Sequence, residues 1–348
     1  MKKIILSVVC LFIISQFGFA QKSKTDTLFV ASWNLENLFD AVKDTGKNDG
    51  EFLPTSKINW TQERLDKKLE NLSKVIRDMN WGHGPDILGV VEVEHQALLD
   101  SLVSRYFKDK NYKIAYFESP DKRGIDNGLI YNSDKFKLLN EIGDTVKLSD
   151  NYPTRLILNA NLLFNKKDTI SFFVNHWPAR LGGQEKSEPN RIDAAGILKR
   201  EVDKRLVANP NAKIIIMGDF NDEPGNKSIK EILSADSIVC NVKTHKPDFN
   251  KKSELFNLAY EDFSKGMGSY KYRDTWNMLD QIIVSKNLVA GKQLKYICSS
   301  FEIFKPEFMV TRSGKYKGTP FPTYGGRTYL GGYSDHFPVT ARFVFKGK

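Results

Sequence analysis

A carboxylate and an amide follow directly after an apolar run in the middle of the chain. The run Lys213–Met217 ends in a glycine, which precedes Asp219 and, two residues later, Asn221. A carboxylate in this position can orient or deprotonate a water molecule, and an amide can donate a hydrogen bond to a phosphate oxygen. A Gly-Asp turn in which Asn221 caps the next helix is the structural alternative. Asp219 and Asn221 are therefore candidate catalytic residues.

Two carboxylates end another apolar run. The run Ile87–Val93 carries Glu92, and Glu94 follows two residues later, on the same face of a strand. Such a pair suits a hard cation such as Mg²⁺, which takes few protein oxygens and keeps several waters. Ordinary exposure at a strand end is the alternative. One carboxylate is enough to hold such an ion, so the role of Glu94 stays open.

Two of the five histidines also lie beside apolar runs. His176 follows the run Ile170–Val174, and His336 precedes the run Val339–Phe345, with Asp335 adjacent. A histidine can transfer protons near neutral pH or donate to a developing anionic oxygen. A structural histidine with satisfied hydrogen bonds is the alternative for each of them.

A further acidic residue, Asp280, begins an otherwise strand-like segment that continues as Gln281–Ser285. Because burial of an unpaired carboxylate is costly, Asp280 needs a partner if it is buried. A histidine fits, since the carboxylate would fix its tautomer and raise its basicity. A charge on an edge strand is the alternative.

The elements that must position these residues are short, β-branched or aromatic runs bounded by polar turns, which are typical of strands. The expected strands are Thr27–Trp33, Ile87–Val93, Gly128–Asn132, Ile157–Phe164, Ile170–Val174, Lys213–Met217, Gln281–Ser285 and Val339–Phe345.

Apolar residues at three- and four-residue spacing predict an amphipathic helix over 61–80, and a second helix from Pro189, in its first turn, to about Leu206. A shorter helix is expected after Gly225, with Ile229, Ile232 and Leu233 facing inward. Strands with few helices and no strict alternation favour a four-layer α/β sandwich, in which two packed mixed β-sheets are flanked by helices, over a parallel doubly wound sheet.

The first twenty residues have the pattern of a secretory signal peptide: a lysine pair, an apolar run over 4–19 and small residues before a cleavage point after Ala20. The apolar run is short for a membrane span, and Cys10 is a poor lipid-attachment site because Val9 precedes it. We therefore expect a single catalytic domain over 21–348, without a membrane anchor, that is secreted or periplasmic and monomeric.

The charge of the chain points to an anionic partner. The formal net charge is +10 and falls to +8 when Lys2 and Lys3 are removed with the leader. Such a balance suits nucleic acid, although solubility alone also explains it. The mature chain keeps only Cys240 and Cys298, which excludes a fold built on disulfides and leaves open whether the two pair.

Read together, these segments resemble the endonuclease/exonuclease/phosphatase superfamily, which includes deoxyribonuclease I, apurinic endonucleases, sphingomyelinases and inositol-polyphosphate phosphatases. Single motifs are weak, but six in the family's order are specific. They are Ser-Trp-Asn-Leu at 32–35, Asp-Ile-Leu-Gly-Val-Val-Glu at 86–92, Asn-His-Trp-Pro at 175–178, Gly-Asp-Phe-Asn at 218–221, Leu-Asp-Gln-Ile at 279–282 and Ser-Asp-His-Phe-Pro-Val at 334–339.

The resemblance assigns roles to residues of this chain. It implies a metal ion held by Asn34 and Glu92 with Asp335 near it, and it places Asp219 and Asn221 over the scissile phosphate. His336, paired with Asp280, would be the general base or the partner of the transition state. His176 falls where nucleases of the deoxyribonuclease I kind keep a second histidine.

Three arginines are implied as phosphate or ligand contacts. Arg155 matches an arginine that some members use on phosphate, which guanidinium geometry suits. The Asn-His-Trp-Pro segment, with Arg180 and Arg191 downstream, is similar to a secreted bacterial branch of the superfamily. One departure from the usual pattern is Val91, which stands where a Gln precedes the metal-binding Glu; Glu92 is followed by Val93-Glu94-His95, which is similar to the same secreted branch and leaves the role of Glu94 open.

The implied activity is metal-assisted hydrolysis of a P–O bond, with Mg²⁺ or Mn²⁺ as cofactor and Ca²⁺ as a further candidate. Nucleic acid, and DNA in particular, is the favoured substrate. A sphingomyelinase-like or inositol-phosphate-type phosphoesterase is the alternative enzyme, and a basic extracellular nucleic-acid-binding protein is the alternative without catalysis.

Overall fold

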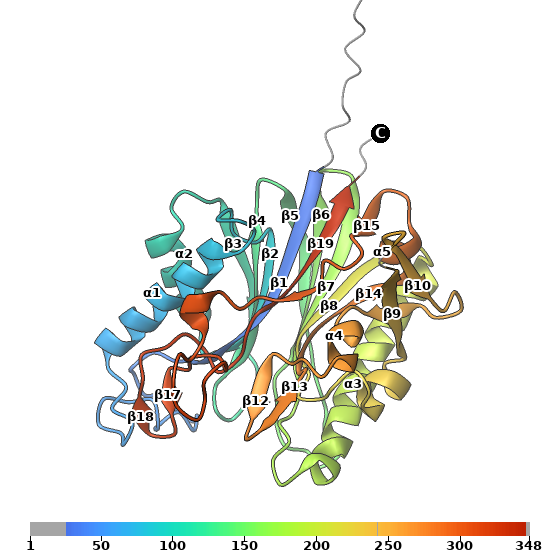
Figure 1. Cartoon of the computed structure of the whole chain (residues 1–348). Helices are drawn as coiled ribbons and strands as arrows, with labels where there is room; N and C mark the ends of the chain where they lie inside the picture. Colours follow the sequence, from blue (N-terminus) through green and yellow to red (C-terminus); the bar gives the residue numbers. More distant parts are fainter. Residues whose placement is uncertain (1–25, 242, 346–348) are drawn as a thin grey trace, which may run out of the picture.

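Two mixed β-sheets pack face to face, and helices cover their outer surfaces (Figure 1). This computed structural model describes residues 26–241 and 243–345. The predicted four-layer α/β sandwich is thereby confirmed. The predicted signal peptide over 1–20 lies outside the described residues. No helix in the described ranges is long and apolar enough to cross a membrane.

The first sheet joins the two ends of the described chain. Its strands β1 and β2 are parallel, and the other pairs are antiparallel. In spatial order the strands are β15 (Leu294–Tyr296), β19 (Val339–Phe345), β1 (Asp26–Leu38), β2 (Ile87–Val93), β4 (Asp126–Asn132) and β3 (Tyr112–Phe117), with β16 (Glu302–Ile303) also paired to β19.

The second sheet has β7 beside β8 in parallel near its centre, and β9 beside β11 is parallel as well. In spatial order the strands are β10 (Lys246–Phe249), β9 (Ala235–Asn241), β11 (Leu255–Asn257), β14 (Asp280–Ser285), β8 (Lys213–Asp219), β7 (Asp168–His176), β6 (Ile157–Phe164) and β5 (Phe136–Asp144). Two short hairpins lie beside the sheets: β12 (Tyr270–Tyr272) with β13 (Thr275–Asn277), and β17 (Tyr324–Gly325) with β18 (Thr328–Tyr329).

The long helices connect the parallel strands. Helix α1 (Gln62–Asp78) joins β1 to β2 and lies on the outer face of the first sheet beside α2 (Gln96–Tyr106), whereas α3 (Gln184–Ala208) joins β7 to β8 on the outer face of the second (Figure 1). Shorter helices complete the fold: η1 (Ser228–Ile232), α4 (Tyr260–Ser264), α5 (Lys286–Ala290) and η2 (Glu307–Met309).

Helix α1 closely follows its sequence signals. Thr61 caps its start by accepting a hydrogen bond from the Arg64 amide, and Arg77 lies in its last turn, where a cation is favourable. Its buried face includes the apolar residues whose spacing predicted the helix: Leu65, Leu69, Leu72 and Ile76.

Helix α3 begins a turn and a half before the predicted start, so Pro189 lies inside the helix rather than in its first turn. The added turn starts at Gly183, whose φ of 112° is accessible mainly to glycine. No side chain caps this start, but Ser187 Oγ donates to the Gly183 carbonyl at 2.7 Å and Arg191 donates to the Gln184 carbonyl at 3.0 Å, which ties the added turn to the rest of the helix.

Strand β8 shows why the central runs are apolar throughout. Ile215 and Met217 pack into the core between the two sheets, whereas Ile214 and Ile216 pack into a separate cluster under α3. Both faces of the strand are therefore buried. The sheets approach so closely that a Cβ atom on Gly89 of β2 would lie 2.6 Å from the Met217 sulfur.

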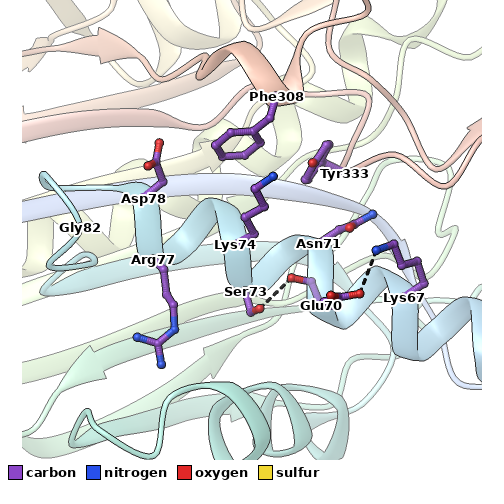
Figure 2. Close-up of a pocket in the computed structure, with 10 residues that line it drawn as sticks. All are labelled: Lys67, Glu70, Asn71, Ser73, Lys74, Arg77, Asp78, Gly82, Phe308 and Tyr333. Atoms are coloured by element: carbon purple, nitrogen blue, oxygen red, sulfur yellow. Dashed lines mark hydrogen bonds and ion pairs between the residues drawn. The ribbon is translucent and has the colours of Figure 1, made fainter.

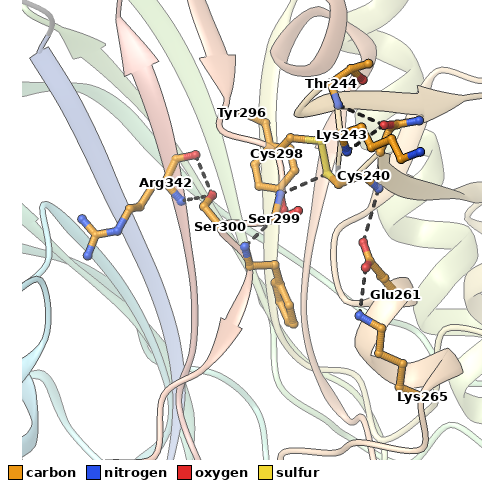
Figure 3. Close-up of a disulfide and its surroundings, with 12 residues drawn as sticks. Cys240, Lys243, Thr244, Glu261, Lys265, Tyr296, Cys298, Ser299, Ser300 and Arg342 are labelled. Carbon is orange, nitrogen blue, oxygen red and sulfur yellow. Dashed lines mark hydrogen bonds and ion pairs between the residues drawn. A yellow bond between two sulfur atoms is a disulfide. The ribbon is translucent and has the colours of Figure 1, made fainter.

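A disulfide between Cys240 and Cys298 connects the two sheets (Figure 3). Cys240 belongs to β9 of the second sheet, and Cys298 follows β15 of the first, with their Cα atoms 5.6 Å apart. The Ser299 amide donates to the Cys240 sulfur at 3.0 Å. The structure thus pairs the two cysteines whose state the sequence left open.

Candidate functional site

The topology brings the ends of several core strands to one edge of the sandwich. Asp219 at the end of β8 pairs with His176 at the end of β7, and with Asp280 at the start of the antiparallel β14. In the other sheet, Ser32 of β1 pairs with Val339 at the start of β19, so Asn34 and the residues just before β19 reach the same edge. Residues far apart in the sequence therefore meet.

A cleft of about 650 Å³ opens at this edge. The structure brings most of the predicted residues into its lining: Asn34, Glu92, Arg155, His176, Asp219, Asn221, Asp335 and His336. Asp280 lies directly behind His336 and is fully buried. Arg180 and Arg191 do not line the cleft.

Asp219 is the central acidic residue. One carboxylate oxygen, Oδ1, accepts the backbone amide hydrogen of Asn221 at 2.8 Å, and the other, Oδ2, accepts from Asn34 Nδ2 at 3.0 Å. The Nε2 atoms of His176 and His336 each lie 3.9 Å from that same Oδ2. Burial raises the pKa of Asp219 to about 6, although the nearby His336 opposes the shift.

His336 is held by a chain of hydrogen bonds on the side away from Asp219. Its Nδ1 lies 2.6 Å from Asp280 Oδ2, which also accepts from Ser269 Oγ at 2.6 Å. The ring of Tyr270 stacks on the His336 ring with centroids 4.5 Å apart. Burial alone would lower the pKa of His336, but the carboxylates of Asp280, Asp335 and Asp219 together outweigh it and raise that pKa well above its ordinary value.

His176 has a different environment. Its Nε2 lies 3.7 Å from Glu92 Oε1, and no described residue gives its buried Nδ1 a hydrogen-bond partner. Burial and the neighbouring guanidinium groups of Arg155 and Arg123 lower the pKa of His176 well below its ordinary value. His176 is therefore a neutral ring that faces the acidic centre without an anchoring carboxylate.

Glu92 turns into the cleft because the backbone of β2 is irregular at this residue. Its φ is 63°, and the pairing between β2 and β4 shifts register between Val91 and Val93. Glu92 Oε2 accepts the Asn37 amide hydrogen at 2.9 Å. Burial opposes its ionisation, but the cationic groups of Arg123 and His336 hold the pKa of Glu92 below its usual range.

Glu94 does not share the face of Glu92, contrary to the expectation from strand periodicity, because of this irregularity. It lies outside the cleft lining, and its Oε2 accepts the Asp40 amide hydrogen at 2.7 Å. Burial raises the pKa of Glu94 to about 8. The Glu94 carboxylate lies in a cluster with Asp40 and His95. One ligand atom from each of the three residues lies within 4.8 Å of the others.

The oxygen ligands on the β1 side of the cleft fit a hard divalent cation. Asp335 lines the cleft beside Glu92, whose Oε1 lies 3.7 Å from both His176 Nε2 and Arg123 Nη2, a distance too long for a hydrogen bond. Two carboxylates with free oxygen lone pairs next to the Asn34 amide form the donor set that Mg²⁺ or Mn²⁺ prefers.

A buried lysine supports this acidic side from below. Lys68 of α1 is almost fully buried, its Nζ donates to Thr323 Oγ1 at 2.6 Å, and it lies 3.8 Å from Glu36 Oε2. Glu36 in turn accepts the amide hydrogens of Thr323 and Tyr324. Burial lowers the pKa of Lys68, although Glu36 opposes the shift. Glu36 is thus engaged by the protein, whereas Glu92 and Asp335 remain available.

Arg155 lies at the cleft wall, but its guanidinium group donates hydrogen bonds to other groups of the protein. Its Nε donates to the His176 carbonyl at 3.2 Å, its Nη2 to the Trp177 carbonyl at 2.7 Å and its Nη1 to Asp121 Oδ2 at 3.2 Å. Arg155 therefore holds the end of β7 in place.

The expectation that Arg180 and Arg191 contact the ligand does not fit the structure. Arg191 has no exposed surface and forms an ion pair with the buried Asp222 at 2.7 Å. Arg180 Nε donates to the Asn221 carbonyl at 2.7 Å, and its other nitrogens bond Asn277 and Asn226. Both arginines instead support the turn that carries Asn221, because Asp222 is a strong partner directly behind it.

Three residues of the site were not singled out from the sequence. Ser269 and Tyr270 contact the Asp280–His336 pair, and Arg123 reaches the cleft from the loop between β3 and β4, with its Nη2 3.7 Å from Glu92 Oε1. Each lies in or next to a loop or short hairpin, where no apolar run marks a strand end. The only sequence signal for Arg123 is that it lies between a lysine and a glycine.

A second hollow, of about 600 Å³, lies beside α1 and contains none of the predicted residues (Figure 2). Its cations have partners of their own: Lys67 pairs with Glu70, Arg77 with Asp109, and Lys74 lies over the Phe308 ring. The chemistry of the molecule is therefore concentrated in the cleft.

Fold and site together define the class of α/β-sandwich phosphoesterases. The chain belongs to the endonuclease/exonuclease/phosphatase family, whose model matches residues 29–344, and the resemblance found in the sequence is confirmed.

Solved structures of the same fold cover nearly the whole chain. The human Nocturnin catalytic domain is 18% identical, with a TM-score of 0.54 over 92% of this chain and 97% of its own. A mannosyl-6-phosphatase of Bacteroides thetaiotaomicron is 17% identical, with a TM-score of 0.55 over 91% and 100%. TDP2 from D. rerio, complexed with single strand DNA product, is 14% identical, with a TM-score of 0.53 over 91% and 98%.

One curated sequence shows a partial similarity. The ribosomal RNA small subunit methyltransferase A of Phytoplasma australiense is 27% identical over 204 residues, which cover 53% of this chain and 66% of that protein. The chain thus spans less than two thirds of that protein's length. A similarity of this extent does not place the chain in the methyltransferase's family.

Proposed function

We propose that residues 21–348 form a single, monomeric catalytic domain, exported to a secreted or periplasmic location, that hydrolyses phosphodiester bonds in nucleic acid with a divalent cation. One observation carries the proposal: Asp219 Oδ2 lies between two histidines, 3.9 Å from each, and next to free carboxylate oxygens at the base of an open cleft. This arrangement suits attack by water on a phosphorus atom.

In this mechanism Asp219 orients the attacking water and accepts its proton. The Asn34 and Asn221 groups that bond its two oxygens fix the direction of the carboxylate. His336 presents Nε2 to the reacting group because Asp280 occupies its Nδ1, and the adjacent carboxylate lets the ring carry a positive charge beside the pentacovalent phosphorane. No covalent enzyme intermediate is required.

His176 and Asn221 contribute further donors. The neutral His176 ring and the second hydrogen of the Asn221 amide, whose first hydrogen bonds the Trp177 carbonyl at 3.0 Å, face the space above Asp219. Both can donate to non-bridging oxygens as charge develops on them. A divalent cation held by Glu92, Asp335 and Asn34 would supply Lewis-acid polarisation of a phosphoryl oxygen and would stabilise the leaving oxygen.

The choice of nucleic acid, with DNA favoured, draws on charge and on relatives. The mature chain keeps a formal charge of +8 after loss of Lys2 and Lys3 from a chain of +10. Among the structures of this fold, one TDP2 holds single strand DNA product. A phosphatase also shares the fold, so mannose 6-phosphate belongs in the assay.

The test is incubation of the purified mature chain with plasmid DNA, RNA, sphingomyelin vesicles and mannose 6-phosphate, with Mg²⁺ or Mn²⁺ and with a chelator. We expect cleavage of DNA that the chelator abolishes and that Asp219→Asn lacks. Cleavage of sphingomyelin or mannose 6-phosphate alone would replace the proposed substrate. DNA binding that survives chelation without any cutting would mean a binding protein rather than an enzyme.

A further inference from the structure

Several hydrogen bonds hold the backbone of the loop between β3 and β4, which contributes Asp121 and Arg123 to the cleft lining. Asp121 Oδ1 accepts the Arg123 amide hydrogen at 2.8 Å, and Lys47 Nζ donates to the carbonyls of Ser119 and Asp121 at 3.1 and 2.9 Å. Gly124, with a φ of 85°, completes the turn. The backbone that carries Arg123 is therefore held in place from both sides.

The side chain of Arg123, in contrast, is little engaged. It is 47% exposed, and its one ion pair is the contact of 3.7 Å between Nη2 and Glu92 Oε1, which is too long for a hydrogen bond. The other arginines near the site differ, since Arg155, Arg180 and Arg191 all donate to carbonyls or side-chain oxygens of the protein. Among these four, Arg123 alone has a guanidinium ready for a ligand.

The contact between Arg123 and Glu92 also links Arg123 to the metal site, because we assign Glu92 as a ligand of the cation. Arg123, whose Nη2 lies 3.7 Å from Glu92 Oε1, is the cationic group that acts most strongly on this carboxylate. A divalent cation on Glu92 would repel the guanidinium at this distance. A phosphate group bound over the cation would attract it, and a guanidinium binds such a group with two parallel hydrogen bonds.

We propose that Arg123 is a phosphate-binding residue that rests on Glu92 in the free protein and transfers to a non-bridging oxygen of the substrate phosphate when the cation and the substrate bind. The positive charge of Arg123 thus pairs first with the Glu92 carboxylate and, after binding, with the substrate phosphate. This inference rests on the proposed function and deepens it, because it assigns the recognition of the phosphate to a residue outside the family's six motifs.

Two opposite effects of one substitution test this role. Removal of the charge in Arg123→Gln should make binding of Mn²⁺ to the substrate-free protein about three- to fivefold tighter, because a competing cation is lost. The same change should raise KM for a short fluorogenic DNA oligonucleotide by about tenfold, with a smaller change in kcat. Calorimetry and initial rates measure the two quantities separately.

Arg123→Lys separates charge from geometry. It keeps the positive charge but loses the bidentate fork, so metal affinity should stay at the wild-type value while KM still rises. Lys122→Gln is the matched control, because Lys122 is an exposed cation in the same loop that does not itself line the cleft, although the Tyr152 ring beneath it does. It should leave both quantities within twofold.

Two results would overturn the role. A KM for Arg123→Gln within twofold of the wild type means that Arg123 does not bind phosphate, and weaker metal binding together with a higher KM means that it merely supports the loop. Binding of inorganic phosphate to the Mn²⁺-loaded protein, measured by calorimetry, keeps the two proposals apart. If the wild type hydrolyses no phosphodiester, the proposed function fails, and the loss of phosphate affinity in Arg123→Gln alone decides the role of Arg123.

Discussion

The two histidines of the cleft stand at equal distances from one carboxylate oxygen and yet have opposite electrostatic environments. His336 Nε2 and His176 Nε2 each lie 3.9 Å from Asp219 Oδ2. Behind His336 lies a buried carboxylate at 2.6 Å, whereas His176 has two guanidinium groups nearby and no partner for Nδ1 among the described residues. Asp280, with Asp335 and Asp219, thus raises the pKa of His336, whereas burial and the two arginines lower the pKa of His176.

This difference shows how one type of side chain serves two roles in one site. A ring with an anchoring carboxylate can carry a charge toward the transition state, while a neutral ring offers a hydrogen bond without repelling a bound cation. The distance of each ring to Asp219 Oδ2 is the same, so the groups around each ring, and above all Asp280 behind His336, set the difference. Substitution of the residues around one histidine should therefore make its charge and its contribution to catalysis more like those of the other histidine.

The largest effect is expected from His336→Ala. It removes the ring that we assign to the developing charge, and kcat for DNA cleavage should fall by about 10³-fold. Metal affinity and the melting temperature of the variant serve as controls for folding. Activity within tenfold of the wild type would contradict the role of His336.

A smaller loss, of about 10²-fold in kcat, is expected from Asp280→Asn, because His336 keeps its place but loses the charge that orients it. Steady-state kinetics measure the loss. Ser269→Ala, which removes the hydrogen bond from Ser269 Oγ to Asp280 Oδ2 and the one that Ser269 Oγ accepts from the Asp280 backbone amide, should lie between this variant and the wild type. Equal rates for Asp280→Asn and the wild type would show that the hydrogen bond between Asp280 and His336 is not the cause of the different roles of His336 and His176.

His176→Ala should reduce kcat by about tenfold, which corresponds to loss of one hydrogen bond to a charged oxygen. The ring has no anchoring carboxylate, so it contributes less than His336 does. The comparison of the two alanine variants under the same metal concentration is the measurement. A loss as large as that of His336→Ala would reverse the assigned roles.

The smallest effect is expected from Tyr270→Leu. The Tyr270 ring stacks on His336 at 4.5 Å, and its removal should reduce kcat about three- to fivefold by loosening the imidazole. Tyr270→Phe keeps the stacking and should retain wild-type activity. If both variants lose activity equally, the hydroxyl rather than the stacking matters.

The sequence was a good guide to the centre of the fold and a poor one to its edges. Runs such as Lys213–Met217 are buried on both faces, so their apolar character shows the strand directly. Strand β5 (Phe136–Asp144) has alternating exposure and many polar residues, and the hairpin β12–β13 is short, so no run of apolar residues marks either. Helix α3 starts earlier than predicted, after Gly183 and without a side-chain cap, so no polar capping residue marks its start in the sequence.

Within the site, residues at the ends of core strands were predictable because rigid strands carry them to a common edge. Glu94 was placed on the wrong face, since the irregular backbone at Glu92 breaks the two-residue period. Arg191 was misjudged because no sequence pattern reveals that Asp222 would bury it. Arg123 was missed for the related reason that a loop residue acquires its neighbours only through tertiary structure.

The pairing of Asp26 with Phe345 places both described ends of the chain side by side, at the end of the first sheet's central strands opposite the cleft (Figure 1). A support or a fusion partner joined at either end would therefore leave the cleft open to long substrates. Immobilised protein should accordingly digest a large plasmid and a short oligonucleotide with the same relative efficiency as protein free in solution.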